Sequence, residues 1–274
     1  WNGYDVADEG VYCRRRLALR PEVQEREQVG SFVARLHHPR ITDPRHGNGI
    51  LSALYCAKPF IAYEYAKRLF EEDPASLKNW SKHLQNVALG VPDIMGFAWH
   101  MLRDRKLAAR KFPSVVIKSR AGLYSVDFHA EQMPDPTSRV GLAQEKDPLG
   151  MPRISIDWRY MQQDVHTVQR SLALLKQDIA QSGVGSFEYD PQSVEKEMVR
   201  YGAYGGHHIG TVRMGASPRT SVTNSDCRVH GVANLYLAGS GVFPTSSQAN
   251  PTLTIVALSL RLADHLHSRD FSGT

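Results

Sequence analysis

The stretch ANLYLAGSGVFPTSSQANPTLTIVALSLRLADHL, residues 233–266, contains the two elements that decide the fold. Residues 233–240 form a short apolar run that ends in small residues, which predicts a buried strand. Residues 251–266 are apolar nearly all round, which predicts an internal helix. A strand, a glycine-rich turn and a buried helix are typical of α/β proteins, where the helix N-terminus meets a ligand at the end of a parallel strand.

The start of this helix is a candidate binding site for an electron-rich group. Pro251 suits a first helical turn, and Asn250 before it is a preferred N-cap. From Thr252 onwards the first amides have no partner within the helix and lie at the positive end of its dipole. They can hold a phosphate, or the pyrimidine end of a flavin, which becomes negative when it accepts a hydride.

Two adjacent histidines lie upstream, in GGHHIGTVRMG, residues 205–215. A hydride leaves an alcohol carbon only if the hydroxyl proton is removed too, and imidazole is the usual base for that proton. Side chains of neighbours in an extended segment point to opposite faces, so at most one of His207 and His208 faces a given pocket. A structural role inside the fold is the alternative for either ring. No metal site is expected, because adjacent histidines have poor ligand spacing and no nearby Cys or carboxylate completes a set.

The first hundred or so residues are expected to be mostly helical and irregular, with helices over 52–72 and 91–112. Beyond Pro113 the residues become β-branched and aromatic, and 124–130 alternate as a half-buried strand does.

A hairpin is expected next, because SRVGLA (138–143) and RISIDWRY (153–160) flank a turn that contains Asp147, Pro148 and Gly150. A helix over 161–183 follows, with Gly183 as its stop. Gln132, Asp135 and Arg139 bracket the first turn of this sheet. Gln132 and Arg139 are candidate substrate-binding residues, and simple turn hydrogen bonds are the alternative.

Composition excludes several classes of protein. The chain has 274 residues, 42% hydrophobic and 22% charged, with a formal net charge of +5, which is typical of soluble globular proteins. The basic clusters at 14–16 and 103–111 lie far apart in sequence, so no nucleic-acid partner is expected. Three widely spaced cysteines make no disulfide framework or zinc motif and suit a cytoplasmic location, with a periplasmic or secreted one left open. No apolar run approaches the roughly 20 residues of a membrane span.

The sequences HHIGTVRMG and NSDCRVHGVANLYLAGSGVFPTSSQANPTLTIVALSLRLADHL resemble the C-terminal signature of the glucose/methanol/choline (GMC) flavin oxidoreductases. The matching features are ordered: a His four residues before the Thr of GT, RMG, RVHGVxNLY, and NPT at the last helix. EQMPDPTSRV (131–140) and MPRISIDWRY (151–160) are similar to the substrate-domain sheet of bacterial members. The NPT form is similar to that of pyranose oxidases.

The resemblance implies a mixed α+β and α/β fold. Residues 1–205 would be a GMC-type substrate-binding domain, helical at first and with an antiparallel sheet from about 113. Residues 206–274 would complete the active site and supply the last strand and helix of a Rossmann-like FAD domain. Family members begin with a GxGxxG fingerprint, which this sequence lacks. An N-terminal FAD-binding half is therefore expected on the same precursor or on a second chain, and the oligomeric state is left open.

Residue roles follow from the resemblance. It implies that His207 is the active-site base and that Asn250 occupies the place of the second catalytic residue. It also implies a set of residues around FAD, with Gly239 and Ser240 near the ribityl and phosphate region and the backbone of Asn250, Pro251 and Thr252 around the pyrimidine ring. Asn250 cannot fully cap the helix and also direct its amide at a substrate hydroxyl, and we favour the catalytic role.

The implied activity is FAD-dependent oxidation of a CH–OH group of a sugar, glycoside or other polyol, by an oxidase or a dehydrogenase. A hydroxynitrile lyase is an alternative within the family. From another class, the chain could be a non-catalytic binding or scaffold module, or a partner subunit, that retains the fold. The presence of both His207 and Asn250 favours catalysis, since a scaffold needs neither.

Overall fold

The computed structural model describes residues 5–6, 8–10, 12–13, 16–60, 77–106, 117, 119–202 and 207–268. The chain forms two compact units, Trp1–Leu17 with Ala34–Phe128 and Ala18–Val33 with His129–Thr274. This division does not coincide with the predicted domain boundary near residue 205, which stays a prediction.

Helices dominate the first unit. They are α2 (Gly49–Cys56), α4 (Leu77–Leu89) and α5 (Val91–Met101), which a π-helical turn extends over Leu102–Lys106. Helix α2 packs against α4 and α5, and the core beneath contains Ile41, Leu51, Tyr55 and Ile117. The short elements are β1 (Asp5–Val6) and β2 (Tyr12–Cys13), which pair antiparallel, and two 3-10 turns, Pro44–His46 and Lys58–Phe60.

The two helices predicted in this unit are only partly confirmed. The helix expected over 52–72 ends at Cys56, because the chain turns at Ala57 into the 3-10 turn that contains Pro59; residues 61–76 lie outside the described ranges. Pro59 has no amide hydrogen to continue the helical ladder. The helix expected over 91–112 is confirmed as α5 and its extension, and residues 107–112 lie outside the described ranges.

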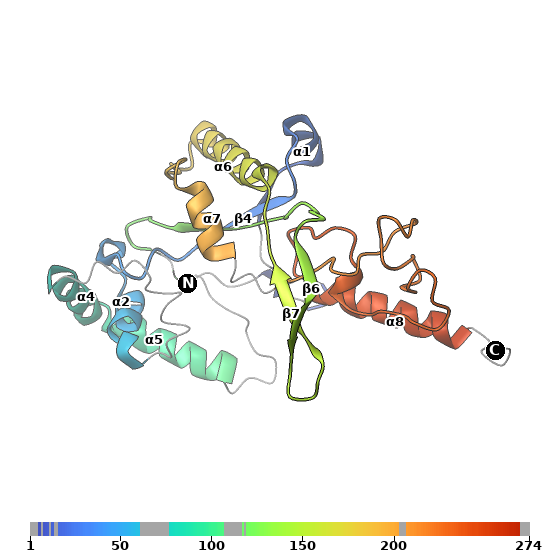
Figure 1. Ribbon diagram of the computed structural model, residues 1–274. Helices are drawn as coiled ribbons and strands as arrows, with labels where there is room; N and C mark the ends of the chain where they lie inside the picture. The colour runs from blue at the N-terminus through green and yellow to red at the C-terminus, as the bar shows by residue number, and fades with distance from the viewer. Residues whose placement is uncertain are drawn as a thin grey trace. The chain divides into compact units, whose positions relative to one another are not determined.

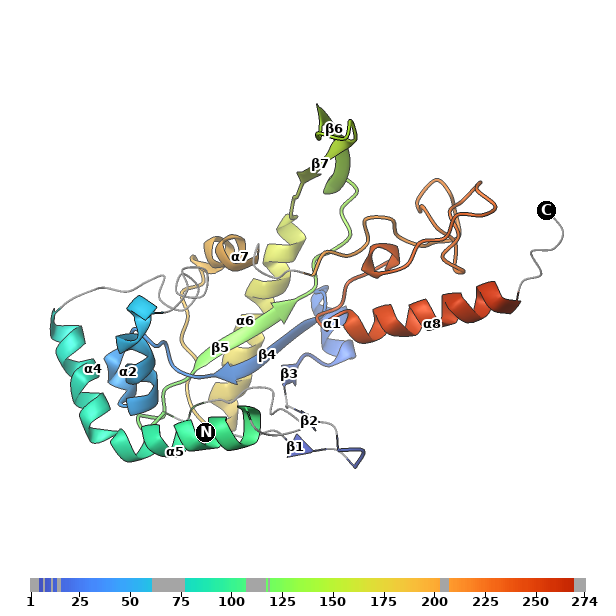
Figure 2. The same cartoon turned by 90° about the horizontal axis from the view of Figure 1, so that it is seen from below.

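A three-stranded sheet has the order β3 (Leu17–Ala18), β4 (Phe32–His37), β5 (Ser125–Ala130). Strands β4 and β5 lie side by side in this sheet (Figure 2). The division between the two units passes through both strands. Strand β5 confirms the predicted alternating stretch, whereas β4 was not expected in a region predicted to be helical and irregular.

The second unit contains α1 (Pro21–Glu27), the hairpin β6 (Arg139–Lys146) and β7 (Pro152–Asp157), α6 (Gln162–Ser182), α7 (Val194–Gly202) and α8 (Thr252–Ser268). The hairpin and α6 confirm the predictions. Asp147 Oδ1 accepts hydrogen bonds from the amides of Leu149 and Met151, which closes the hairpin turn. Gly183 ends α6 with a φ of 67°. The mixture of helices with antiparallel strands is the α+β fold class that was expected (Figure 1).

The C-terminal region has its own small core of Cys227, Val242, Phe243 and Leu262. One face of α8 packs on it through Ile255, Leu258 and Leu266. The opposite face is exposed, with Leu253, Val256 and Leu260 at 82%, 51% and 63% exposure. The prediction of an internal helix is therefore wrong for this chain, because its described segments cover only one side of the helix.

The strand expected over 233–240 is not formed either. Its segment makes a single antiparallel bridge, between Tyr236 and Arg228, with hydrogen bonds from Val229 to Leu235 and from Leu237 to Cys227. A strand needs a partner along its length, and here the pairing with residues 227–229 is limited to this one bridge. None of the helices in the described ranges is both long and apolar enough to span a bilayer.

Candidate active site

The histidine segment lies alongside the turn that was predicted to approach the cofactor. Backbone amides of Gly210, Val212 and Met214 donate to the carbonyls of Ser240, Gly241 and Val242 at 3.1, 2.9 and 2.8 Å. The Ser240 hydroxyl donates to the His208 carbonyl at 2.9 Å. The structure thus brings together two segments that the sequence separates by about thirty residues, a separation that short hydrogen-bonded turns cannot bridge.

Two glycines make this approach possible. Gly239 has φ 99° and ψ −174°, a backbone conformation that is essentially restricted to glycine. A Cβ on Gly239 would meet no atom of the described residues within 4 Å, so that side of the turn is open in the part of the chain that the structure describes. Gly241 is in close contact instead, since a Cβ there would lie 3.0 Å from Val212 Cγ2 and 3.1 Å from Thr211 Oγ1.

His207 and His208 are both exposed in this chain. Exposure leaves the two rings accessible to a small molecule. Which ring faces a substrate stays a prediction, and so does the role of His207 as the base.

The loop before α8 is anchored by a carboxylate that the sequence analysis did not single out. Glu131 directly follows β5, and its Oε1 accepts the amide of Ser247 at 3.2 Å. Its Oε2 accepts the amide of Ser31 at 3.4 Å. The Ser246 hydroxyl donates to the Gln132 carbonyl at 3.4 Å in the same place. The sequence shows only that a carboxylate directly follows a predicted strand. The neighbouring residues do not indicate which distant amides it binds.

The start of α8 differs by one residue from the prediction. The first helical bond runs from the Ile255 amide to the Pro251 carbonyl at 2.9 Å, so Pro251 takes the N-cap position and Asn250 precedes it. The capping role of Asn250, which was the alternative to its catalytic role, is therefore not seen here. Asn250 is exposed, and its side chain makes no hydrogen bond within the described part of the chain. The amide group is thus available to a ligand.

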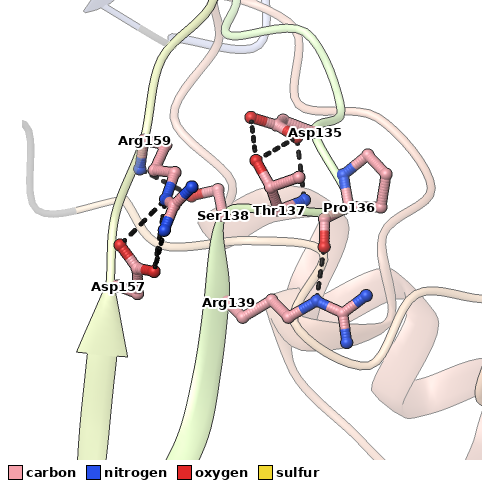
Figure 3. Close-up of polar contacts among 7 residues, drawn as sticks. All are labelled: Asp135, Pro136, Thr137, Ser138, Arg139, Asp157 and Arg159. Carbon is pink, nitrogen blue, oxygen red and sulfur yellow. Dashed lines mark hydrogen bonds and ion pairs between the residues drawn. The ribbon is translucent and has the colours of Figure 1, made fainter.

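The candidate substrate-binding residues are engaged in hydrogen bonds within the chain. Gln132 Nε2 donates to the Arg159 carbonyl at 2.6 Å, and Gln132 Oε1 accepts from Trp158 Nε1 at 3.0 Å. Arg139 Nε donates to the Pro136 carbonyl (Figure 3). Only the Arg139 bond is a turn hydrogen bond of the kind that formed the alternative, since the Gln132 bonds reach the segment after β7. A substrate-binding role for Gln132 and Arg139 stays a prediction.

Two carboxylates near this turn are held ionised by their neighbours. The amide and hydroxyl of Thr137 donate to Asp135 and lower its pKa. The Arg159 guanidinium donates to Asp157, with the shortest contact at 2.7 Å, and lowers the pKa of that carboxyl (Figure 3). Neither group is therefore suited to accept a proton near neutral pH. In the described ranges no three His, Cys, Asp or Glu side chains gather as metal ligands.

Residues 134–259 match the family described as GMC oxidoreductase. The fructose dehydrogenase large subunit of Gluconobacter japonicus is 36% identical over 152 residues, which cover 53% of this chain and 26% of that protein. A C-glycoside 3-oxidase of Microbacterium trichothecenolyticum is 37% identical over 121 residues, 44% of this chain and 22% of the relative. A pyranose 2-oxidase of Tricholoma matsutake is 27% identical over 181 residues, 64% of this chain and 31% of the relative.

Among solved structures, pyridoxine 4-oxidase from Mesorbium loti is similar with a TM-score of 0.37 and 18% identity, over 56% of this chain and 32% of that one. The residues that match the family model lie in the C-terminal part of this chain and make up less than half of it. The match confirms the resemblance to the GMC oxidoreductases for residues 134–259. The chain spans less than a third of the length of each of the three relatives described above.

Proposed function

We propose that this chain is the substrate-side part of an FAD-dependent GMC oxidoreductase that oxidises a CH–OH group of a sugar, glycoside or other polyol. The observation that carries the proposal is the backbone pairing between the histidine segment and the turn at Ser240–Val242. It sets a candidate base beside the segment assigned to the cofactor. The relatives described as fructose dehydrogenase, C-glycoside 3-oxidase and pyranose 2-oxidase support a sugar or glycoside substrate.

The residues present fit a flavin. No atom of the described residues lies within 4 Å of a Cβ position on Gly239, so this side of the backbone is open to a ligand. The first amides of α8, from Thr252 onwards, have no partner within the helix and lie at its positive end. Gly239 and Ser240 would hold the ribityl and phosphate region. The backbone of Asn250, Pro251 and Thr252 would hold the pyrimidine ring.

Bound FAD would supply the acceptor for the hydride that leaves the substrate carbon. An unprotonated nitrogen of His207 takes the hydroxyl proton as the C–H bond breaks, so the alcohol becomes a carbonyl and His207 becomes an imidazolium. The Asn250 side-chain amide donates a hydrogen bond to the same substrate oxygen and orients it. The amides at the start of α8 stabilise the negative charge that arrives with the hydride.

The proposal includes a partner, because family members carry a nucleotide fingerprint that is not in this sequence. The N-terminal FAD-binding half would be part of the same precursor or a second chain. The enzyme would act in the cytoplasm. A non-catalytic binding module is the second candidate, favoured only by the missing fingerprint.

The visible absorption spectrum of the purified native protein tests the proposal first. Oxidised-flavin bands are expected, and a sugar or polyol added under anaerobic conditions should bleach them. A folded protein without these bands, even when its natural partner chain is supplied, would contradict the flavoenzyme and favour the binding module.

A further inference from the structure

We propose that Glu131 is a positioning residue that holds the loop carrying Asn250. The inference deepens the proposed function, since Asn250 matters to catalysis only if the chain belongs to an active oxidoreductase. The structural part of the inference does not depend on activity and can be tested separately.

The argument begins at the end of β5. Glu131 is fixed by its own backbone, because its amide donates to the Ser31 carbonyl at 2.9 Å. Its Oε2 accepts the Ser31 amide in return, and its Oε1 accepts the Ser247 amide, which lies 116 residues further along the chain. One carboxylate therefore joins the segment before β4 to the loop before α8. Bonds from amides to an ionised acceptor are stronger than bonds to a neutral one.

Ser247 needs such an anchor. Its φ is 65°, in the left-handed region that residues with a Cβ disfavour. A charged acceptor on its amide offsets that preference and keeps the turn in one conformation.

The ordered turn continues to the candidate catalytic residue. The Ser247 hydroxyl donates to Gln248 Oε1 at 2.9 Å and accepts the Ala249 amide at 3.4 Å. Asn250 follows immediately, with no hydrogen bond of its own side chain within the described ranges. Its position is therefore set by the turn before it and by α8 after it. Glu131 itself has both oxygens engaged with amides, which argues against a direct role as a base.

Amide hydrogen exchange of the full chain tests the anchor without any need for activity. Glu131→Gln removes the charge and one acceptor, and we expect exchange of the amides in residues 243–250 to rise at least about tenfold. Glu145→Gln, an exposed carboxylate on β6, is the matched control and should leave this exchange unchanged. If Glu131→Gln leaves exchange of the loop at the level of the original protein, the inference is overturned.

Kinetics of the holoenzyme test the positioning role. Glu131→Gln should lower the rate of flavin reduction at saturating substrate about tenfold, while the pH at which that rate falls on the acid side stays the same, because the base is intact. Ser247→Gly in the Glu131→Gln background should recover part of the rate, because glycine adopts the left-handed conformation without penalty. An unchanged rate in Glu131→Gln overturns the role.

Two further outcomes separate this inference from the proposed function. Should Glu131→Gln fail to fold, Glu131→Asp replaces it, since the shorter carboxylate cannot reach both amides and should give the same increase in loop exchange. A protein that binds no flavin contradicts the proposed function, whereas the exchange of residues 243–250 still decides whether Glu131 anchors the loop.

Discussion

At the scale of single residues, Gly239 sets the path of the chain between the bridge at Tyr236 and the turn beside the histidines. Its φ of 99° belongs to a conformation that is essentially restricted to glycine. Among the described residues no atom lies within 4 Å of a Cβ position there. The cost of a side chain would therefore come from the backbone alone.

Gly239→Ala should destabilise the chain by about 1–3 kcal/mol, the usual cost of forcing a residue with a Cβ into such a conformation. Urea unfolding measures the difference. Gly185→Ala is the matched control, because a methyl group on Gly185 would also enter open space, while its φ lies outside the left-handed region. Equal stabilities of the two variants would show that the turn relaxes without cost.

His207 carries the chemical prediction at this scale. His207→Ala should slow flavin reduction by about 100-fold or more, the usual contribution of a positioned base. Stopped-flow absorbance under anaerobic conditions measures the rate, and His208→Ala should be much less affected. If His208→Ala slows flavin reduction strongly and His207→Ala does not, the base is His208.

At the scale of elements, local signals explain what could be predicted. Asp147 and Gly150 close the β6–β7 hairpin within a few residues, and Gly183 ends α6 through its own left-handed φ. The hairpin turn and the end of α6 depend on residues only a few positions apart, so a sequence pattern can predict them. The N-cap of α8 was predicted one residue early, because Asn250 and Pro251 both suit helix starts and only the first hydrogen bond decides between them.

Helix α8 has one packed and one exposed face, so truncating a leucine should cost different amounts of stability on the two faces. Leu262 is 9% exposed in the small core, whereas Leu260 is 63% exposed. Leu262→Ala should cost about 2–4 kcal/mol of unfolding free energy, because it leaves a cavity in the core. Leu260→Ala should cost less than about 1 kcal/mol in the same urea experiment, since that side chain gives up little buried area in this chain. Similar losses for both variants would mean that the exposed face is covered in solution.

At the scale of the whole molecule, a buried histidine couples stability to pH. His46 is 1% exposed, and its Nδ1 accepts the Asn48 amide at 2.9 Å. Burial first, and then the nearby His83 ring, lower the pKa of His46 to about 4. The backbone of Ile41 and the Asp43 carboxylate act in the opposite direction, and the more weakly acting His38 ring lowers the pKa further. The His83 ring itself stacks on Tyr55, with centroids 3.9 Å apart.

The folded pKa of His46 lies below its ordinary value of 6.5, so the fold favours the neutral ring. Its contribution is present above pH 6.5 and is lost as the pH falls from 6.5 to about 4. The loss should be on the order of 3 kcal/mol at most. Urea unfolding at a series of pH values measures it. His46→Gln should flatten the curve in this window, while His166→Gln, at an exposed position, should not.

The sequence by itself predicted the GMC resemblance of residues 134–259, the β6–β7 hairpin, α6 and the last helix, because motifs and turns depend on residues that are close along the chain. The candidate pair His207 and Asn250 also comes from the sequence and stays a prediction. The tertiary structure decided the rest. Only folding brings the Ser240–Val242 turn against the histidine segment, joins Glu131 to Ser247 across 116 residues, and leaves one face of α8 uncovered. These contacts depend on distant segments meeting in space, and no local pattern records which acceptor a distant amide will find.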